Sequence, residues 1–378
     1  MTNEEQFTKI IEKNTKHLEN AKEHTQYKIG YIKSYISKWL KVAERYNQNN
    51  VNFIDCMCNA GIYKNNILCT CTEVVKLFVE SAKQFPHKQF NVFLNDYNEN
   101  RIKILEEVII VLNAEKLANL NIYYDTCDVV QYLNNFPKYD NKLKNALTIL
   151  YVDPYNFGID NLLNSTLNFV DRYYCELIYN FFSSDIRRNI SNDTAINKSQ
   201  SILKELKGVI EEFDVNEFDV LDAMVKVQES YKKTRNIKYT FAYKFKVVKT
   251  NVELYYILYF TPNIRGLELL KESIWDVFGG ESSFSKYFVK YKDLPTLFDQ
   301  ETMLVESYAN ELVSILKEKY NGLEVSYTEI ETYVLENSFL KSTHIIKHII
   351  KPLIKMNILT KENLKGSRNY KEDFYIFS

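Results

Sequence analysis

Short, almost wholly apolar segments alternate with helix-like segments over the first half of the chain, and this alternation constrains the fold more than any other feature. Segments that are apolar on both faces and separated by helices are typical of parallel strands covered by helices on both sides. Five segments have this character: VNFID (51–55), FNVFLND (90–96), LNIYYD (120–125), ALTILYVD (146–153) and YYCELIYNF (173–181). The sequence therefore predicts an α/β fold built on a parallel sheet.

Further elements are expected before and after these strands. A long helix with a basic polar face is predicted over residues 18–46, where apolar residues recur at helical spacing. The acidic segment 200–230 is predicted to be a helical insertion over one end of the sheet. Residues 239–262 are expected to form an antiparallel hairpin that turns near Thr250 and Asn251.

The C-terminal part of the chain predicts a winged-helix region. Three amphipathic helices precede two strands that flank the basic segment LKGSR (364–368). Between residues 338 and 378 there are eight Lys or Arg against three acidic residues. Lys347 and Lys351 lie on the third helix and are expected to bind phosphate groups by charge. The expected organisation is an N-terminal helical segment (1–50), an α/β domain (51–298) and a winged-helix region (299–378).

Bulk composition excludes two kinds of partner for the chain as a whole. With a net charge of −1 over 378 residues, no global field draws the protein to nucleic acid or lipid, so any such attraction is local. The N-terminal segment lacks the apolar core of a signal peptide, and the longest apolar run, LYYILYF (254–260), is too short to cross a membrane. Six cysteines without regular spacing fit a reducing compartment, so we expect a cytoplasmic protein with no membrane partner.

Acidic residues fall at or just beyond the C-terminal ends of the predicted parallel strands. These are Asp55, Asp96, Asp125 and Asp153, with Asp128 three residues beyond the third strand. In open α/β sheets, ligands bind in the crevice outside these strand ends. A strand-ending Asp can instead cap the following helix, but core strands have no reason to end in Asp four times. The sequence therefore predicts a polar ligand site along this edge of the sheet.

The positions of these residues suit an adenosine. The turn CMCNAG (56–61) has a single glycine, so it is not the GxGxxG phosphate cradle of dinucleotide-binding proteins. Asp96 would grip the two hydroxyls of a ribose, and Asp128 would accept from an adenine amino group. An adenosine pocket without a phosphate cradle indicates S-adenosylmethionine rather than NAD or ATP. The predicted cofactor-binding residues are Asp55, Cys58, Asn59, Gly61, Asp96 and Asp128.

The fourth strand ends in Asp153-Pro154-Tyr155, which resembles the (D/N)PP(Y/F) loop of amino-methyltransferases with one proline missing. In those enzymes the loop holds the target amine in line with the methyl group, which is a task of positioning. These three residues are the predicted catalytic residues, although DPY also fits a strand-end turn. Arg187 and Arg188 follow the fifth strand and are predicted either to grip an anionic substrate or to be solvated surface residues.

Four cysteines lie close together in the sequence, as Cys56 and Cys58 and then Cys69 and Cys71. Zinc and iron–sulfur sites favour CxxC, because two intervening residues let both sulfurs point inward. The CxC spacing instead favours cysteines used as small apolar side chains. We therefore expect no metal site here, with metal binding and a redox pair kept as alternatives.

Taken together, the motifs resemble the three-Cys-motif partner protein family, which has an S-adenosylmethionine-dependent methyltransferase-like fold. The resemblance covers nearly the whole chain, and the order and spacing of the motifs carry it. The stretches that resemble the family are EHTQYKIGYIKSYISKWL (23–40), FIDCMCNAGIY (53–63), LNDYNENR (94–101), YVDPYNFG (151–158) and ELYYILYFTPNIRGLELLKESIW (253–275).

The resemblance implies roles that spacing alone does not. His24 and Lys28 correspond to the family's H-T-x-x-K helix beside the cofactor crevice and are predicted to contact substrate. The first turn departs from the family pattern, because Asn59-Ala60-Gly61 replaces the version with two glycines. The implied partner is a three-Cys-motif protein, of radical-S-adenosylmethionine or phage type, to which the three cysteines of the family name belong.

The leading hypothesis is a Rossmann-like, S-adenosylmethionine-dependent methyltransferase whose winged helix recruits a nucleic acid or a protein. The rival is a non-catalytic adaptor that keeps the fold and binds its partner through the winged helix. A Mg²⁺ nuclease using Asp55, Asp96 and Asp153 is less favoured, because neighbouring strands hold their ends about 5 Å apart and no P-D…(D/E)-x-K arrangement occurs.

Overall fold

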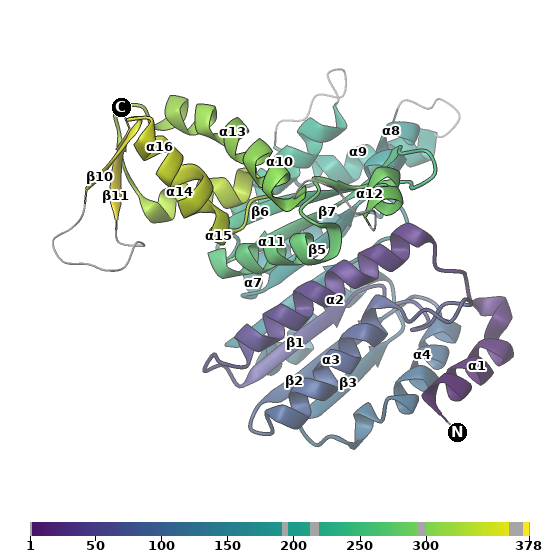
Figure 1. Cartoon of the computed structure of the whole chain (residues 1–378). Helices are drawn as coiled ribbons and strands as arrows, with labels where there is room; N and C mark the ends of the chain where they lie inside the picture. The colour runs from purple at the N-terminus through teal and green to yellow at the C-terminus, as the bar shows by residue number, and fades with distance from the viewer. Residues whose placement is uncertain (1, 191–195, 212–218, 293–299, 363–372, 378) are drawn as a thin grey trace. The chain divides into compact units, whose positions relative to one another are not determined.

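The computed structural model describes residues 2–190, 196–211, 219–292, 300–362 and 373–377. The chain divides into two compact units, Met1–Pro262 and Asn263–Ser378 (Figure 1). The division comes earlier than the boundary at residue 298 that the sequence suggested. The reason is helix α11 (Ile264–Phe278), whose Lys271 and Trp275 donate hydrogen bonds to the carbonyls of Ser338 and Phe339 within the second unit, at 2.5 and 2.7 Å.

The first unit is built on a sheet with the strand order β3-β2-β1-β4-β5-β7-β6. The strands β1 to β5 are mutually parallel, whereas β7 is antiparallel to both β5 and β6. Their bounds are β1 Asn50–Asp55, β2 Gln89–Asn95, β3 Leu120–Asp125, β4 Ala146–Val152, β5 Glu176–Phe181, β6 Tyr239–Lys246 and β7 Glu253–Thr261. The predicted α/β fold, with parallel strands plus an antiparallel hairpin in one sheet, is confirmed.

Helices cover both faces of this sheet. Helices α2, α3 and α4 form one layer, with α1 packed on α4 (Figure 1), and helices α5, α7, α9 and α10 contribute to the apolar core on the other face. Their bounds are α1 Asn3–Asn14, α2 Glu23–Ala43, α3 Thr70–Gln84, α4 Glu99–Val111, α5 Val129–Asn134, α6 Asp140–Leu143, α7 Leu162–Arg172, α8 Ser183–Asn189, α9 Ile196–Lys207 and α10 Val220–Lys232. No described helix is long and apolar enough to cross a membrane.

Two sequence expectations need adjustment in this unit. Helix α2 begins at Glu23 rather than at residue 18, because the chain before it is extended at Lys22, the N-cap residue. The acidic segment 200–230 is helical where it is described, in α9 and α10, while residues 212–218 lie outside the described part.

A row of polar side chains crosses the buried middle of the sheet. Asn91 donates to the Asn52 side chain (2.9 Å), Asn52 donates to Thr148 (3.1 Å), and Asn121 donates to Asn91 (3.2 Å). These residues stand opposite one another in the strand registers of β3, β2, β1 and β4. A shift of one strand by one residue would leave buried amides without partners, which is costly. The row therefore specifies the register that aligns the strand ends.

The second unit contains the elements that the sequence expected, with three additions. Its elements are α11, β8 Ser283–Phe284, α12 Lys286–Tyr291, α13 Gln300–Tyr320, β9 Glu324–Ser326, α14 Tyr327–Asn337, α15 Ser342–Ile345, a π-helical turn Ile346–Ile350, α16 Lys351–Lys355, β10 Leu359–Glu362 and β11 Phe374–Phe377. The additions are β8, α12 and β9, of which β9 pairs with β11 in an antiparallel sheet of order β10-β11-β9. The segment LKGSR (364–368) lies outside the described residues, and the winged-helix assignment stays a prediction.

We predict that Asn91→Ala lowers the free energy of unfolding by about 2 to 4 kcal/mol, because it removes one partner from Asn52 and one from Asn121 in a buried sheet. Urea denaturation followed by circular dichroism measures this change. The matched control is Asn121→Ala, at a half-buried position at the end of the row, for which we expect a loss below about 1 kcal/mol. Equal losses for the two variants would contradict the role given to the row.

Candidate active site

A crevice runs along the carboxyl edge of the parallel strands and consists of two adjoining cavities. One, of about 270 Å³, is bordered by α2 and is called the α2 cavity. The other, of about 440 Å³, is bordered by α4 and is called the α4 cavity. Glu19, Met57 and Tyr155 line both cavities, so the two adjoin and share part of their walls. The predicted ligand edge of the sheet is therefore hollow where the strand-end aspartates lie.

Asp96, just beyond β2, lies at the base of the α4 cavity and has a fixed orientation. Its two carboxylate oxygens accept the backbone N–H groups of Asn59 (3.2 Å) and Asn98 (2.9 Å), one on each oxygen. Arg101 lies 3.6 Å from the same carboxylate and hydrogen-bonds the Tyr155 hydroxyl. Because a carboxylate oxygen has two lone pairs, each oxygen of Asp96 keeps acceptor capacity toward the cavity.

Asp128 borders the same cavity and also caps helix α5. One of its oxygens, Oδ1, accepts the backbone N–H groups of Val130 (2.9 Å) and Gln131 (3.3 Å). This is the helix-capping role that the sequence left open as an alternative. Asp125 pairs with Lys138 at 3.2 Å and lines neither cavity. The capping bonds leave the second oxygen of Asp128 for a ligand.

In the turn after β1, only some of the predicted cofactor-binding residues line a cavity. Cys58 and Asn59 line the α2 cavity, whereas Gly61 lies behind the turn, against α4. Gly61 has φ +76°, and a Cβ atom there would stand 2.5 Å from Leu105 and 2.9 Å from Thr72. The glycine is required for helix packing at a left-handed position. Its expected role of letting the backbone approach a ligand has no support in this geometry.

Asp153, just beyond β4, is the centre of a polar cluster in the α2 cavity. Its Oδ2 accepts from Lys28 Nζ at 2.5 Å and from the Tyr151 hydroxyl at 3.1 Å, and its Oδ1 accepts from Asn180 Nδ2 at 2.6 Å. Lys28 comes from the buried face of α2 and Asn180 from the end of β5. Three separate elements thus hold one carboxylate, and the predicted pair of His24 and Lys28 lies beside the predicted DPY turn.

The charges in this cavity are strongly coupled. Burial raises the pKa of Asp55 well above its usual range, and the Asp153 and Asp96 carboxylates raise it further, partly opposed by the Met57 N–H bond and by Lys28. Burial lowers the pKa of His24 to about 4, and Lys28 also lowers it, so this imidazole is neutral at pH 7. The Lys28–Asp153 ion pair is therefore the main charged feature of the α2 cavity.

Aromatic rings wall the α2 cavity around this ion pair. Tyr255, from β7, lies with its ring 5.6 Å from Lys28 Nζ and 5.4 Å from the ring of Phe182. Its hydroxyl is buried and has no hydrogen-bond partner among the described residues. Burial raises the pKa of Tyr255, and the Asp153 carboxylate raises it further. Tyr255, which lines the cavity, therefore has a buried hydroxyl whose hydrogen-bonding capacity is unused among the described residues.

Sequence reasoning missed four residues of this crevice: Arg101, Tyr151, Asn180 and Tyr255. Three of them lay within stretches that carry the family resemblance, namely LNDYNENR, YVDPYNFG and ELYYILYF, without a role being given to them. Asn180 had only one signal, an amide at the end of a buried apolar strand.

Four predicted substrate-binding residues do not line the crevice. Arg187 pairs with Glu253 of β7 at 2.7 Å, and Arg188 pairs with Asp185 of the same helix, α8, at 2.9 Å. Lys347 and Lys351 belong to the second unit, where both side chains are exposed. The structure brings together His24, Lys28 and the DPY turn, and leaves these other four elsewhere.

The four cysteines near the first turn are buried free thiols. Cys56, Cys58, Cys69 and Cys71 are buried, and burial raises the pKa of the first three thiols. Cys71 donates to the carbonyl of Cys58 at 3.1 Å. Within the described ranges, no group of three or more His, Cys, Asp or Glu is placed to hold a metal ion.

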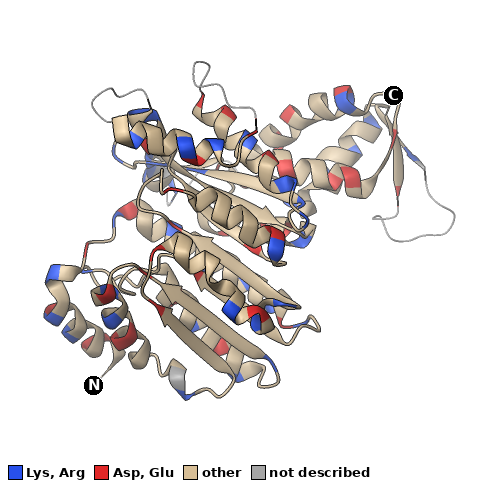
Figure 2. Cartoon of the chain, turned by 180° about the vertical axis from the view of Figure 1, so that it is seen from behind, with Lys and Arg blue, Asp and Glu red and all other residues tan. Residues whose placement is uncertain are grey.

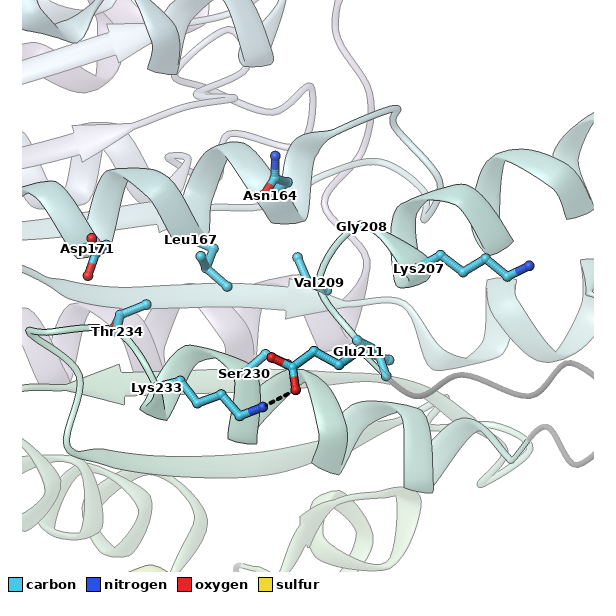
Figure 3. Close-up of a pocket in the computed structure, with 11 residues that line it drawn as sticks. Asn164, Leu167, Asp171, Lys207, Gly208, Val209, Glu211, Ser230, Lys233 and Thr234 are labelled. Atoms are coloured by element: carbon cyan, nitrogen blue, oxygen red, sulfur yellow. Dashed lines mark hydrogen bonds and ion pairs between the residues drawn. The ribbon is translucent and has the colours of Figure 1, made fainter.

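A separate hollow of about 380 Å³ lies between α7 and α10, away from the strand-end aspartates (Figure 3). Lys233 and Glu211 form an ion pair across it at 2.7 Å, and Asp171 borders it from the end of α7. None of the residues predicted to be functional lines it. The crevice at the strand ends is therefore the candidate active site.

No family model matches this chain, and no curated protein matches it. Among solved structures, a protein from Klebsiella pneumoniae assigned as an O-methyltransferase is 9% identical, with a TM-score of 0.37 over 68% of this chain and 89% of that chain. A geranyl diphosphate C-methyltransferase from Streptomyces coelicolor A3(2), in complex with Mg²⁺, geranyl diphosphate and S-adenosyl-L-homocysteine, is 7% identical, with a TM-score of 0.28 over 60% and 79%. At such low TM-scores neither likeness carries an argument about this chain.

We predict that Tyr255→Phe raises the free energy of unfolding by about 1 kcal/mol, because it removes a buried hydroxyl without a partner and keeps the ring. The matched control is Tyr256→Phe, the next residue on β7, whose hydroxyl donates to Glu253 at 2.8 Å. That variant is expected to lose about 1 kcal/mol. Urea denaturation of both variants checks the opposite signs, and a destabilised Tyr255→Phe would show that its hydroxyl is bonded.

Proposed function

We propose that this chain is an S-adenosylmethionine-dependent methyltransferase. The cofactor would lie in the α4 cavity and extend past Met57 and Tyr155 into the α2 cavity, where the acceptor binds. The observation that carries the proposal is that two different cavities adjoin along the carboxyl edge of this sheet. One ends at an oriented carboxylate, Asp96, and the other at the Asp153 cluster.

The residues of the α4 cavity fit the adenosine part of this cofactor. Asp96 has free acceptor capacity on both oxygens, which suits the two hydroxyls of a ribose. Asp128 has a second oxygen for an amino group, and Val129 and Ile159 supply apolar contacts for a base. Cys58 and Asn59 line the other end of the path, in the α2 cavity.

Methyl transfer needs an acceptor held in line with an activated methyl group, and the cofactor supplies that group on its sulfonium. The chain's own task is to bind, orient and exclude water. Asp153, Pro154 and Tyr155 would face the acceptor, with Lys28, Asn180 and Tyr151 holding Asp153 in place. Aromatic residues (Tyr63, Tyr151, Tyr155, Phe182 and Tyr255) line this cavity together with charged residues (Glu19, Lys22, Lys28, Asp55 and Asp153).

We predict that the purified chain binds S-adenosylmethionine and S-adenosylhomocysteine in calorimetric titrations and that Asp96→Ala weakens both at least tenfold. Hydrogen bonds to a charged group contribute about 1.5 to 3 kcal/mol each, and the variant removes the acceptor for two hydroxyls. The matched control is Asp125→Ala, a strand-end aspartate that lines neither cavity, for which we expect unchanged affinity. An absence of heat at millimolar ligand would leave the non-catalytic adaptor as the better description.

The second unit supports a separate proposal, that it binds nucleic acid through the helix containing Lys347 and Lys351. Both residues are exposed, one helical turn apart, and Lys355 follows at the same spacing. Figure 2 shows Lys and Arg interspersed with Asp and Glu along the ribbon of the first unit. A three-Cys-motif protein as partner and a cytoplasmic location stay expectations.

We predict that the chain shifts duplex DNA or RNA in a salt-dependent manner and that Lys347→Ala with Lys351→Ala weakens this binding by about tenfold at low salt. Each lysine that leaves a phosphate contact reduces the number of counterions released. The comparison pair is Lys103→Ala with Lys83→Ala, two exposed lysines on the helices of the first unit, for which we expect no effect. A shift that persists unchanged in the first double variant would contradict the assignment of this helix.

A further inference from the structure

The Asp153 cluster restricts which acceptor atom fits the α2 cavity. A carboxylate offers about four lone-pair positions, and donors from Lys28, Tyr151 and Asn180 occupy three of them. An amino group needs acceptors for two N–H bonds while its lone pair points at the methyl group. A hydroxyl needs an acceptor for only one. Taken by itself, the one remaining position on Asp153 serves the O–H of a hydroxyl but not both N–H bonds of an amine.

Donors in the same cavity strengthen this restriction. Lys28 uses one of its three N–H groups on Asp153, and the Tyr255 hydroxyl is buried without a partner. A neutral amine nitrogen has one lone pair, which the reaction consumes, so it can satisfy neither donor. A hydroxyl oxygen that is losing its proton has further lone pairs and can accept from both. The cavity thus stabilises a developing oxyanion.

The walls of the cavity indicate what carries the hydroxyl. Tyr255, Phe182, Tyr63 and Tyr155 line it from different elements, together with the Lys28–Asp153 ion pair. Aromatic side chains around a small volume favour a planar ring placed between them. A hydroxyl on such a ring could contact the Lys28–Asp153 pair, because both line the same cavity.

We propose that the acceptor is a hydroxyl group on an aromatic ring, with Lys28 and Tyr255 donating to its oxygen and Asp153 taking its proton. This inference rests on the proposed methyltransferase function. The hydroxyl oxygen attacks the methyl carbon, the carbon–sulfur bond breaks with its electron pair going to sulfur, and the hydroxyl proton passes to the Asp153 carboxylate. The products are a methyl ether, a neutral thioether and protonated Asp153, so atoms and charges balance.

The test uses 4-nitrophenol and 4-nitroaniline, which have the same shape, with protein saturated with S-adenosylhomocysteine. We expect 4-nitrophenol to bind at least tenfold more tightly, since only its oxygen satisfies both donors. Its absorbance should shift to that of the phenolate at a pH below its pKa in free solution. Equal or tighter binding of 4-nitroaniline, or binding of neither, would overturn the inference.

Two variants separate a functional role from a structural one. Tyr255→Phe should weaken 4-nitrophenol binding by about tenfold and reduce the phenolate shift, whereas Tyr256→Phe should change neither. Lys28→Met should abolish the shift, and Lys28→Arg should restore part of it, because the positive charge returns. An unchanged shift in both Tyr255→Phe and Lys28→Met would overturn the proposed donors.

Titration with S-adenosylhomocysteine separates a failure of the acceptor assignment from a failure of the proposed methyltransferase function. If the protein binds S-adenosylhomocysteine but does not prefer 4-nitrophenol to 4-nitroaniline, the acceptor assignment is wrong and the methyltransferase proposal stands. If the protein does not bind S-adenosylhomocysteine, both proposals are wrong. Melting temperatures of all variants show whether a loss of binding reflects loss of the folded state.

Discussion

The register of the parallel strands is the constraint on which the candidate site depends. A shift of one residue would move a strand end by about 3.3 Å and turn every side chain to the opposite face. In this sheet the apolar faces are supplemented by Asn52, Asn91 and Thr148, which stand side by side in a buried row. Amides in such a place specify register more sharply than apolar side chains do, because only one alignment satisfies their hydrogen bonds. The strand-end aspartates meet at one edge as a consequence.

The sheet and the row of acidic residues at its carboxyl edge could be predicted because both depend on short local patterns in the sequence. Apolar runs of strand length, separated by helical patterns, specify parallel strands, and an acid directly after such a run has to lie at the carboxyl edge. Asp96 and Asp153 were placed in this way, and each lines a cavity as expected. The role of Asp128 was less determined, because helix capping and ligand binding ask for the same residue at the same position.

The remainder of the site depends on contacts between distant segments. Lys28, Asn180 and Tyr255 come from α2, β5 and β7, and no spacing in the sequence shows that the first two hold Asp153 while the third faces the same cavity. The glycine of the first turn was interpreted as a ligand contact, yet its position is determined by Leu105 on a neighbouring helix. Local sequence patterns thus predict where the edge of the sheet lies, whereas tertiary packing determines which distant side chains contact the crevice there.

Three hydrogen bonds to Asp153 from the chain itself change the interpretation of the DPY turn. A free carboxylate after β4 would resemble the amine-holding loop that the sequence suggested, whereas a carboxylate with three donors has little capacity left for an amine. Near it, burial and the neighbouring carboxylates hold Asp55 toward its uncharged form. A ligand with a positive charge at the Asp55 end would favour the ionised form of that residue. Binding of a cationic group beside β1 would therefore be coupled to release of the proton from Asp55.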